Sequence, residues 1–242
     1  MIEIAKKEFF SFLNSLIAYV VISVFLTGIG LLMWVFPESS VLEYGYADME
    51  TLFSLGPYVL MFFIPAITMK QFAEEYKTGT IELLLTRPLT DWQIILGKFI
   101  ASWGLALVAL VPTFIYYWSV YFLGDPVGNL DTPGIIGSYV GLSLLCGVFT
   151  SIGIFSSSLT RNQIVAFVLA VFLCFFLYYG FRSVAGLNLW KAFSLFVDQL
   201  GIVFHYDSLS KGLLDSRNVF YFLSVMTFML LATKLVIGSR KW

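Results

Sequence analysis

The stretch FIASWGLALVALVPTFIYYWSVYFL, from Phe99 to Leu123, decides the fold of this chain because it is long, apolar and free of charged residues. A helix that crosses the hydrocarbon core of a membrane needs about 20 mostly apolar residues. The proline within the stretch, Pro112, is compatible with such a helix, because neighbouring membrane helices re-satisfy the carbonyl that a proline frees. The stretch therefore predicts a transmembrane helix.

Five further apolar runs have the same character, and together the runs define the predicted fold. Transmembrane helices are expected at about residues 16–36, 52–69, 96–123, 135–159, 164–181 and 219–237. The first run is too long for the apolar part of a signal peptide and lacks a cleavage site with small residues. We predict an all-α integral membrane protein, with six transmembrane helices in a single domain that covers residues 1–242.

The composition excludes several other classes of protein. Charged residues make up 12% of the chain, against about 25% in soluble domains. The 25 Phe, 13 Tyr and 6 Trp residues exclude a disordered chain, and a net charge of −1 offers no basic surface to nucleic acid. Cys146 and Cys174 both lie inside apolar runs, where a thiol behaves as a small hydrophobe rather than as a metal ligand.

The distribution of Lys and Arg predicts the orientation in the membrane. Six spans place both termini on one side, and that side carries most of the 14 basic residues. The two shorter loops on the other side, residues 37–51 and 124–134, contain acidic residues but neither Lys nor Arg. Because cytoplasmic loops are enriched in Lys and Arg, both termini are predicted to lie in the cytoplasm.

Two segments beside the spans are predicted to be helical without crossing the membrane. Apolar residues recur at helical spacing in residues 2–14, which indicates an amphipathic elbow helix or the frayed start of the first span. In the outer region 183–218, Leu189, Phe193 and Phe196 recur in the same way, in a stretch too short to span. This stripe favours a re-entrant or interfacial helix that serves either as an anchor or as a ligand site.

The cytoplasmic segment KQFAEEYKTGTIELLLTRPLTDWQIILGK, from Lys70 to Lys98, separates the second span from the third. Thr80 can begin a short helix, and Pro88 should end it because the residue before a proline avoids helical geometry. Thr90 and Gln93 have the spacing of a capping box, which predicts that the next helix begins there. From Thr90 to Leu123 a continuous helix measures about 51 Å, so it should start in the cytosol.

The run Leu83–Leu85 in this segment would face water on a short cytoplasmic helix. An exposed apolar run favours a docking surface for a partner protein, but a helix lying on the membrane surface without a partner remains an alternative. In the fourth span, Gly137 and Gly141 form a pair of small residues one turn apart. Such pairs let helices approach closely in lipid, so this face is predicted to pack against another helix, either of this chain or of a second permease.

The sequence contains no motif for chemistry of its own. No glycine-rich loop precedes Gly97-Lys98, so a phosphate-binding P-loop is absent. His205 is the only histidine, so a Ser-His-Asp catalytic triad would have to combine it with Asp207 or Asp198. Such a triad would also need a nucleophile elbow, which the sequence lacks. The first five spans have no ionisable residue in their interiors, which argues against an ion-coupled carrier. We predict no catalytic residue, no metal site and no cofactor in this chain, and an energy source outside it.

The segment KTGTIELLLTRPLTDWQIILGK resembles the signature between the second and third spans of ABC-2-type permeases. Further stretches resemble the gliding-motility-associated, Gld-type permease subunit of an ABC transporter: GDPVGNLD at 124–131, TSIGIFSSSLTRNQIVAF at 150–167, CFFLYYGF at 174–181 and SLSKGLLDSRNVFYFLS at 208–224. The resemblance covers the whole chain. It implies six spans, an elbow helix, a cytoplasmic coupling helix and outer re-entrant helices before the last span.

The resemblance also implies the site and the partners. The coupling segment would be residues 74–88, with a second contact in the turn that carries Arg161. The residues carried over to the coupling surface are Glu74, Glu75, Lys77, Thr78, Gly79, Thr80, Glu82, Leu83, Leu84, Arg87 and Pro88. The expected partners are a dimer of cytoplasmic ABC ATPase subunits, which would bind ATP and Mg, and a companion membrane subunit with a large extracytoplasmic domain. The expected location is the bacterial inner membrane.

Three classes of function follow from the sequence and the resemblance. In the first, the chain is a non-catalytic permease subunit that couples ATP hydrolysis in a partner to export or extraction of a substrate. In the second, it is a scaffold that passes ATPase motion to an extracytoplasmic partner without any substrate crossing. The third, an intramembrane enzyme, would require polar catalytic groups that face one another within the spans, and the sequence offers almost none.

Overall fold

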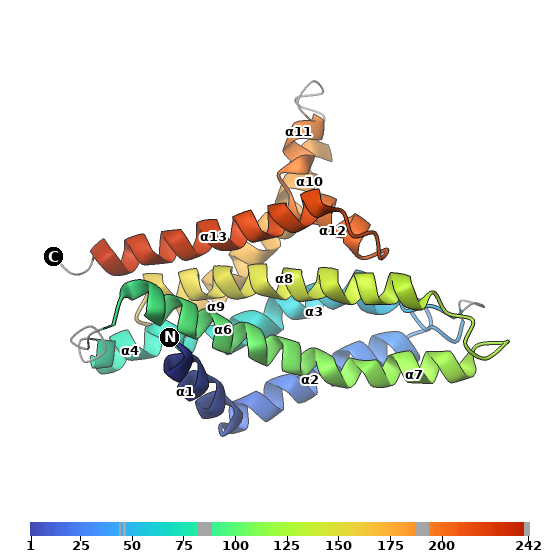
Figure 1. Ribbon diagram of the computed structural model, residues 1–242, viewed down its shortest axis with the longest axis horizontal. Helices are drawn as coiled ribbons and strands as arrows, with labels where there is room; N and C mark the ends of the chain where they lie inside the picture. Colours follow the sequence, from blue (N-terminus) through green and yellow to red (C-terminus); the bar gives the residue numbers. More distant parts are fainter. Residues whose placement is uncertain (44, 46, 82–88, 187–193, 240–242) are drawn as a thin grey trace.

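The computed structural model describes the chain except residues 44, 46, 82–88, 187–193 and 240–242. Within the described residues every regular element is a helix, as predicted (Figure 1). The elements are α1 (Ile2–Leu13), α2 (Leu16–Trp34), α3 (Glu50–Thr68), α4 (Lys70–Thr78), α6 (Asp91–Leu110), η1 (Val111–Thr113), α7 (Phe114–Leu123), α8 (Thr132–Leu159), α9 (Gln163–Phe175), η2 (Phe176–Gly180), α10 (Phe181–Gly186), α11 (Ser194–Gln199), α12 (Ile202–Leu209) and α13 (Ser216–Ser239).

The structure contains enough long apolar helices for a multi-pass membrane protein. Five helical stretches in the described part of the chain are long and apolar enough to cross a membrane: 50–78, 91–123, 132–159, 163–186 and 216–239. Helices α1 and α2 make a sixth if the pair, bent by 72°, is counted as one broken span. The predicted all-α membrane fold is confirmed, with five to six spans.

Helix α8 is the central element of the bundle. It packs against α3, α4, α6, α9, α12 and α13, and 72% of its apolar stretch is buried inside the bundle. Figure 1 shows the long helices running side by side, with α4 and the C-terminal end of α13 at one end of the bundle. We call this the α4 end. The α7–α8 connection lies at the opposite end, which we call the far end.

The third spanning helix is continuous despite its proline. Thr90 and Gln93 form the predicted capping box, and the helix then runs from Asp91 to Leu123 through the 3₁₀ turn η1. Pro112 has no N–H to donate to the carbonyl of Val108, and the N–H of Val111 donates to this carbonyl instead. The tighter turn thus repairs the interruption locally. At 1.5 Å per residue the helix measures about 50 Å, longer than the ~30 Å hydrocarbon core.

The fifth spanning helix extends beyond its expected end near residue 181. It continues through the π-helical segment η2 into α10, whose last described residue is Gly186. Helix α11 packs back against α10, and Figure 1 shows this pair projecting from the side of the bundle. The helix continues through Gly180, and no proline occurs between Gln163 and Gly186 to stop it. Of the predicted apolar stripe, Leu189 and Phe193 lie outside the described residues.

The glycine face of α8 lies against the end of α12 and the segment that follows it in the same chain. A Cβ placed on Gly141 would lie 2.6 Å from the Cβ of Leu209, and one on Gly137 would lie 2.5 Å from the carbonyl oxygen of Gly212. Gly212 itself has a φ of +79°, which favours glycine. Ser138 adds a hydrogen bond to the carbonyl of Ser210 at 2.8 Å. The small residues therefore permit a close contact between α8 and the α12 region.

Candidate functional site

The site begins with α4, the short helix that follows α3 at the α4 end of the bundle. Gly79, with a φ of +73°, ends this helix, and helical geometry resumes at Thr80 and Ile81. The predicted coupling residues Glu74, Lys77, Thr78, Gly79 and Thr80 are exposed. The remaining ones in the loop lie outside the described residues: Glu82, Leu83, Leu84, Arg87 and Pro88.

Helix α4 has one exposed and one buried face. Gln71, Phe72 and Ala73 are buried, and Glu74 and Lys77 point to the opposite side. The helix packs against α8 and α9, whose connection carries the exposed Arg161. An amphipathic helix of this kind can present one face to a partner while the other is held by the bundle.

Lys98 in α6 holds the buried face of α4. Only 1% of its side chain is exposed, and its Nζ donates to Glu75 Oε1 and to the Gln71 carbonyl, each at 2.7 Å. The Lys98 Nζ also lies 5.1 Å from the centroid of the Phe72 ring. Gln71 in turn donates from Nε2 to Ser102 Oγ at 2.9 Å. A buried charge needs such partners, so the Lys98 ammonium group joins α4 to α6.

Ser157 in α8 holds the beginning of α4. Its Oγ accepts hydrogen bonds from the N–H groups of Phe72 and Ala73, at 3.0 and 3.1 Å, and donates to the Met69 carbonyl at 2.9 Å. The first N–H groups of a helix have no partner within that helix. Ser157 therefore caps α4 from another helix, and in doing so ties α4 to α8.

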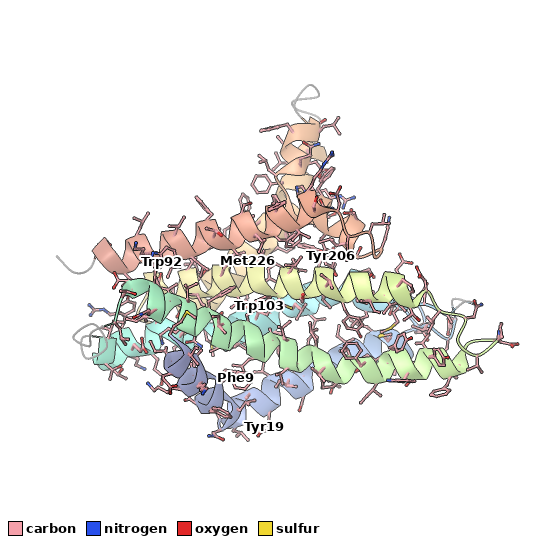
Figure 2. All side chains as sticks on the ribbon, viewed as in Figure 1. Phe9, Tyr19, Trp92, Trp103, Tyr206 and Met226 are labelled. Atoms are coloured by element: carbon pink, nitrogen blue, oxygen red, sulfur yellow. The ribbon has the colours of Figure 1, made fainter. Side chains whose placement is uncertain are left out.

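Helix α1 completes the site by lying across α6 (Figure 2 shows Phe9 on this helix). Glu8 Oε1 lies 3.5 Å from Lys98 Nζ, so the lysine also reaches α1. A Cβ on Gly97 would lie 2.9 Å from Ile4 Cγ2, which shows how closely the two helices cross. Lys70 of α4 lies over the Phe12 ring, 4.7 Å from its centroid.

An open cavity of about 930 Å³ lies between these elements. Its walls come from α1, α4, the start of α6 and the residues beside the undescribed segment 82–88. Lys7, Glu8, Lys70 and Glu74 are among the charged lining residues. The cavity therefore combines both signs of charge at the α4 end of the bundle.

The structure adds contacts at Glu75 and Lys98 that the sequence does not reveal. Glu75, which is expected on the coupling surface, is half-buried, and its carboxylate pairs with the buried Lys98. Lys98 and Ser157 were not predicted as site residues. A signal for Lys98 was present, since a lysine about two helical turns into a predominantly apolar helix requires a partner. Ser157 gives no such signal, because serine is common in packed membrane helices.

The remaining candidates for chemistry have structural partners. His205 Nδ1 lies 2.8 Å from Asn218 Oδ1, His205 Nε2 lies 2.9 Å from the Gln199 carbonyl, and the ring stacks on Tyr221. Asp207 pairs with Arg182 at 2.7 Å. Among the residues that the structure describes, no three His, Cys, Asp or Glu side chains gather to hold a metal ion.

These features define a multi-pass helical membrane protein whose α4 end carries a short amphipathic helix bound to two spanning helices. The chain belongs to the ABC-2 family transporter proteins, whose family pattern it matches over residues 2–238. A search of the curated proteins found no match. Family membership indicates a non-catalytic permease subunit of an ABC transporter, which works with an ABC ATPase.

Proposed function

We propose that this chain is the permease subunit of a gliding-motility-type ABC transporter, and that residues 74–88 receive force from its ATPase. The observation that supports the proposal is the attachment of α4 to two spanning helices, through Lys98 to α6 and through Ser157 to α8. A push on the exposed side of α4 would be passed to both helices. Through Glu8, the same push would reach α1.

The surrounding assembly follows from the same proposal. ATP and Mg bind to the ATPase dimer, and this chain carries no cofactor. The α4 end faces the cytoplasm of a bacterium, and the far end faces the outside of its inner membrane. There a companion membrane subunit with a large extracytoplasmic domain joins the complex. ATP hydrolysis in the ATPase drives export or extraction of a substrate through or along the helical bundle.

The proposed orientation predicts which positions can be labelled from outside intact cells. Single cysteines at Ser39 and Asn129 should react with an impermeant maleimide, whereas those at Thr78 and Ser239 should react only after permeabilisation. The native Cys146 and Cys174 are buried and give a low background. Reaction of the Thr78 or Ser239 variant in intact cells would contradict the orientation.

The coupling role is tested by removing the apolar run of the segment. Leu83→Ala with Leu84→Ala should weaken ATPase capture by a tagged permease about 30-fold or more, since truncated apolar anchors at an interface cost ~2 kcal/mol or more. Glu74→Ala is the matched control. Glu74 is an exposed charge on α4, and its loss should weaken capture much less, because charges at the rim of an interface contribute little.

The measurement is copurification of the ATPase from detergent extracts, together with ATPase activity in nanodiscs. Thermal unfolding of the membrane chain alone should be the same for both variants, because neither is expected to disturb the bundle. If the double leucine variant captures the ATPase as well as the parent does, the segment is an ordinary surface helix and the coupling role is wrong.

A further inference from the structure

Towards the far end of the bundle, helix α3 contains a proline, Pro57. A proline inside a helix has no N–H, so the carbonyl four residues earlier loses its helical donor. In α3 this carbonyl belongs to Phe53. Phe53 is buried, and a buried carbonyl without a donor is costly, the more so where no water can replace the donor.

Tyr206 of α12 supplies the missing donor. Its hydroxyl donates to the Phe53 carbonyl at 2.8 Å, and only 2% of the tyrosine is exposed. Burial raises the pKa of the Tyr206 hydroxyl well above its ordinary value, so the group stays protonated and remains a donor. In Figure 2 Tyr206 lies between α12 and the bundle.

The repair at Pro57 differs from the repair at Pro112. At Pro112 the chain itself provides the donor, through the N–H of Val111 in the 3₁₀ turn η1. At Pro57 the donor comes from a residue 153 positions away in the sequence. The geometry of α3 at Pro57 therefore depends on whether α12 is in place.

Helix α12 is itself tied to three other helices. The carbonyl of Ser210, directly after α12, accepts from Ser138 of α8, and Asp207 pairs with Arg182 of α10. His205 and Ser208 both bond to the side chain of Asn218 in α13. Tyr206 thus connects the proline-weakened α3 to a junction that includes α8, α10 and α13.

We propose that Tyr206 is a positioning residue that acts as a latch, holding the far-end turns of α3 against α12. When the hydroxyl leaves the Phe53 carbonyl, α3 bends at Pro57 and the segment from Glu50 to Phe53 swings away from α12. The latch therefore determines whether α3 and α12 are in contact or apart at the far end. It does not depend on ATPase docking at residues 74–88, so it can fail or hold independently of that proposal.

The test is Tyr206→Phe in the full chain in nanodiscs, with spin labels on cysteines at Glu50 and Lys211. Both positions are exposed, one at the start of α3 and the other in the turn after α12. Loss of one intramolecular hydrogen bond should raise the ratio of separated to closed label pairs about 3- to 10-fold. The fraction of folded protein should be the same in the variant and the parent. If Tyr206 had a purely structural role, the variant would lose thermal stability but the labels would not move apart.

Two further variants make the test specific. Tyr221→Phe is the matched control, because its hydroxyl also donates to a backbone carbonyl, that of Leu200 at 2.6 Å, where no proline frees the acceptor. This variant should leave the label distances unchanged. Pro57→Ala restores an N–H for the Phe53 carbonyl, so the double variant with Tyr206→Phe should return to the closed distribution.

Unchanged label distances in Tyr206→Phe, or an equal change in Tyr221→Phe, would overturn the latch. Failure of Pro57→Ala to restore the closed distribution would overturn it as well. If Tyr206→Phe does not fold, folding of the double variant with closed labels supports the proposal, and failure of the double variant to fold contradicts it.

Discussion

Lys98→Met is expected to cause one of the largest losses of stability that a single substitution can produce in this chain. The change removes the buried ammonium group and leaves the Glu75 carboxylate, which it contacts at 2.7 Å, without its cation. Breaking a buried ion pair on one side costs about 3–5 kcal/mol, and the 18% exposure of the Glu75 side chain places this pair at the lower end of that range. The measurement is thermal and denaturant unfolding of the purified chain in detergent, with ATPase copurification as the functional readout.

Lys77→Met is the matched control for Lys98→Met. Lys77 carries the same charge on α4 but is exposed, and surface substitutions usually change stability by less than about 0.5 kcal/mol. Adding Glu75→Met to Lys98→Met should recover part of the lost stability, because a buried apolar pair replaces the unpaired carboxylate. Equal stability of the Lys77 and Lys98 variants would show that the ion pair does not hold α4 in place.

Gly141→Leu is expected to separate α8 from α12. The first carbon of any side chain at this position would lie 2.6 Å from Leu209 Cβ, well inside van der Waals contact. Overpacking of this kind costs about 1–3 kcal/mol, and leucine adds three further carbons. Thermal unfolding should show the loss, and the yield of the assembled complex should fall.

Gly238→Leu provides the control for Gly141→Leu. Gly238 also lies in a long helix, α13, but a Cβ there meets no atom within 4 Å. This variant should retain the stability and the yield of the parent. If Gly141→Leu retains them too, the close approach of α8 to Leu209 at the end of α12 contributes little to the fold.

Local patterns in the sequence account for the elements that were predicted well. The apolar runs predicted the spanning helices because the length of such a run must match the membrane. The Thr90–Gln93 capping box was predictable because its two hydrogen bonds lie within four residues. The Gly137–Gly141 face could be recognised as a packing surface, but not the segment that packs on it.

The contacts that the sequence did not reveal join residues far apart in the chain. Lys98 bonds to Gln71 and Glu75, and Tyr206 bonds to Phe53. Nothing in a single sequence pairs one polar residue with another across such distances. Helical spacing showed that Lys98 needed a partner, but only the packing of α4 on α6 determines which one. The extension of the fifth helix to Gly186 was missed because hydropathy falls before the helix ends.

The cap that Ser157 provides for α4 also bears on the order in which the protein matures. A membrane chain is made from its N-terminus. Ser157 lies 85 residues after Phe72 and 84 after Ala73, the two residues whose N–H groups it accepts from. Helix α4 is therefore synthesised before Ser157. Those N–H groups gain their final acceptor only when α8 has entered the bilayer. A partner that recognises finished α4 would therefore bind permease whose fourth span is in place and would pass over nascent or truncated chains.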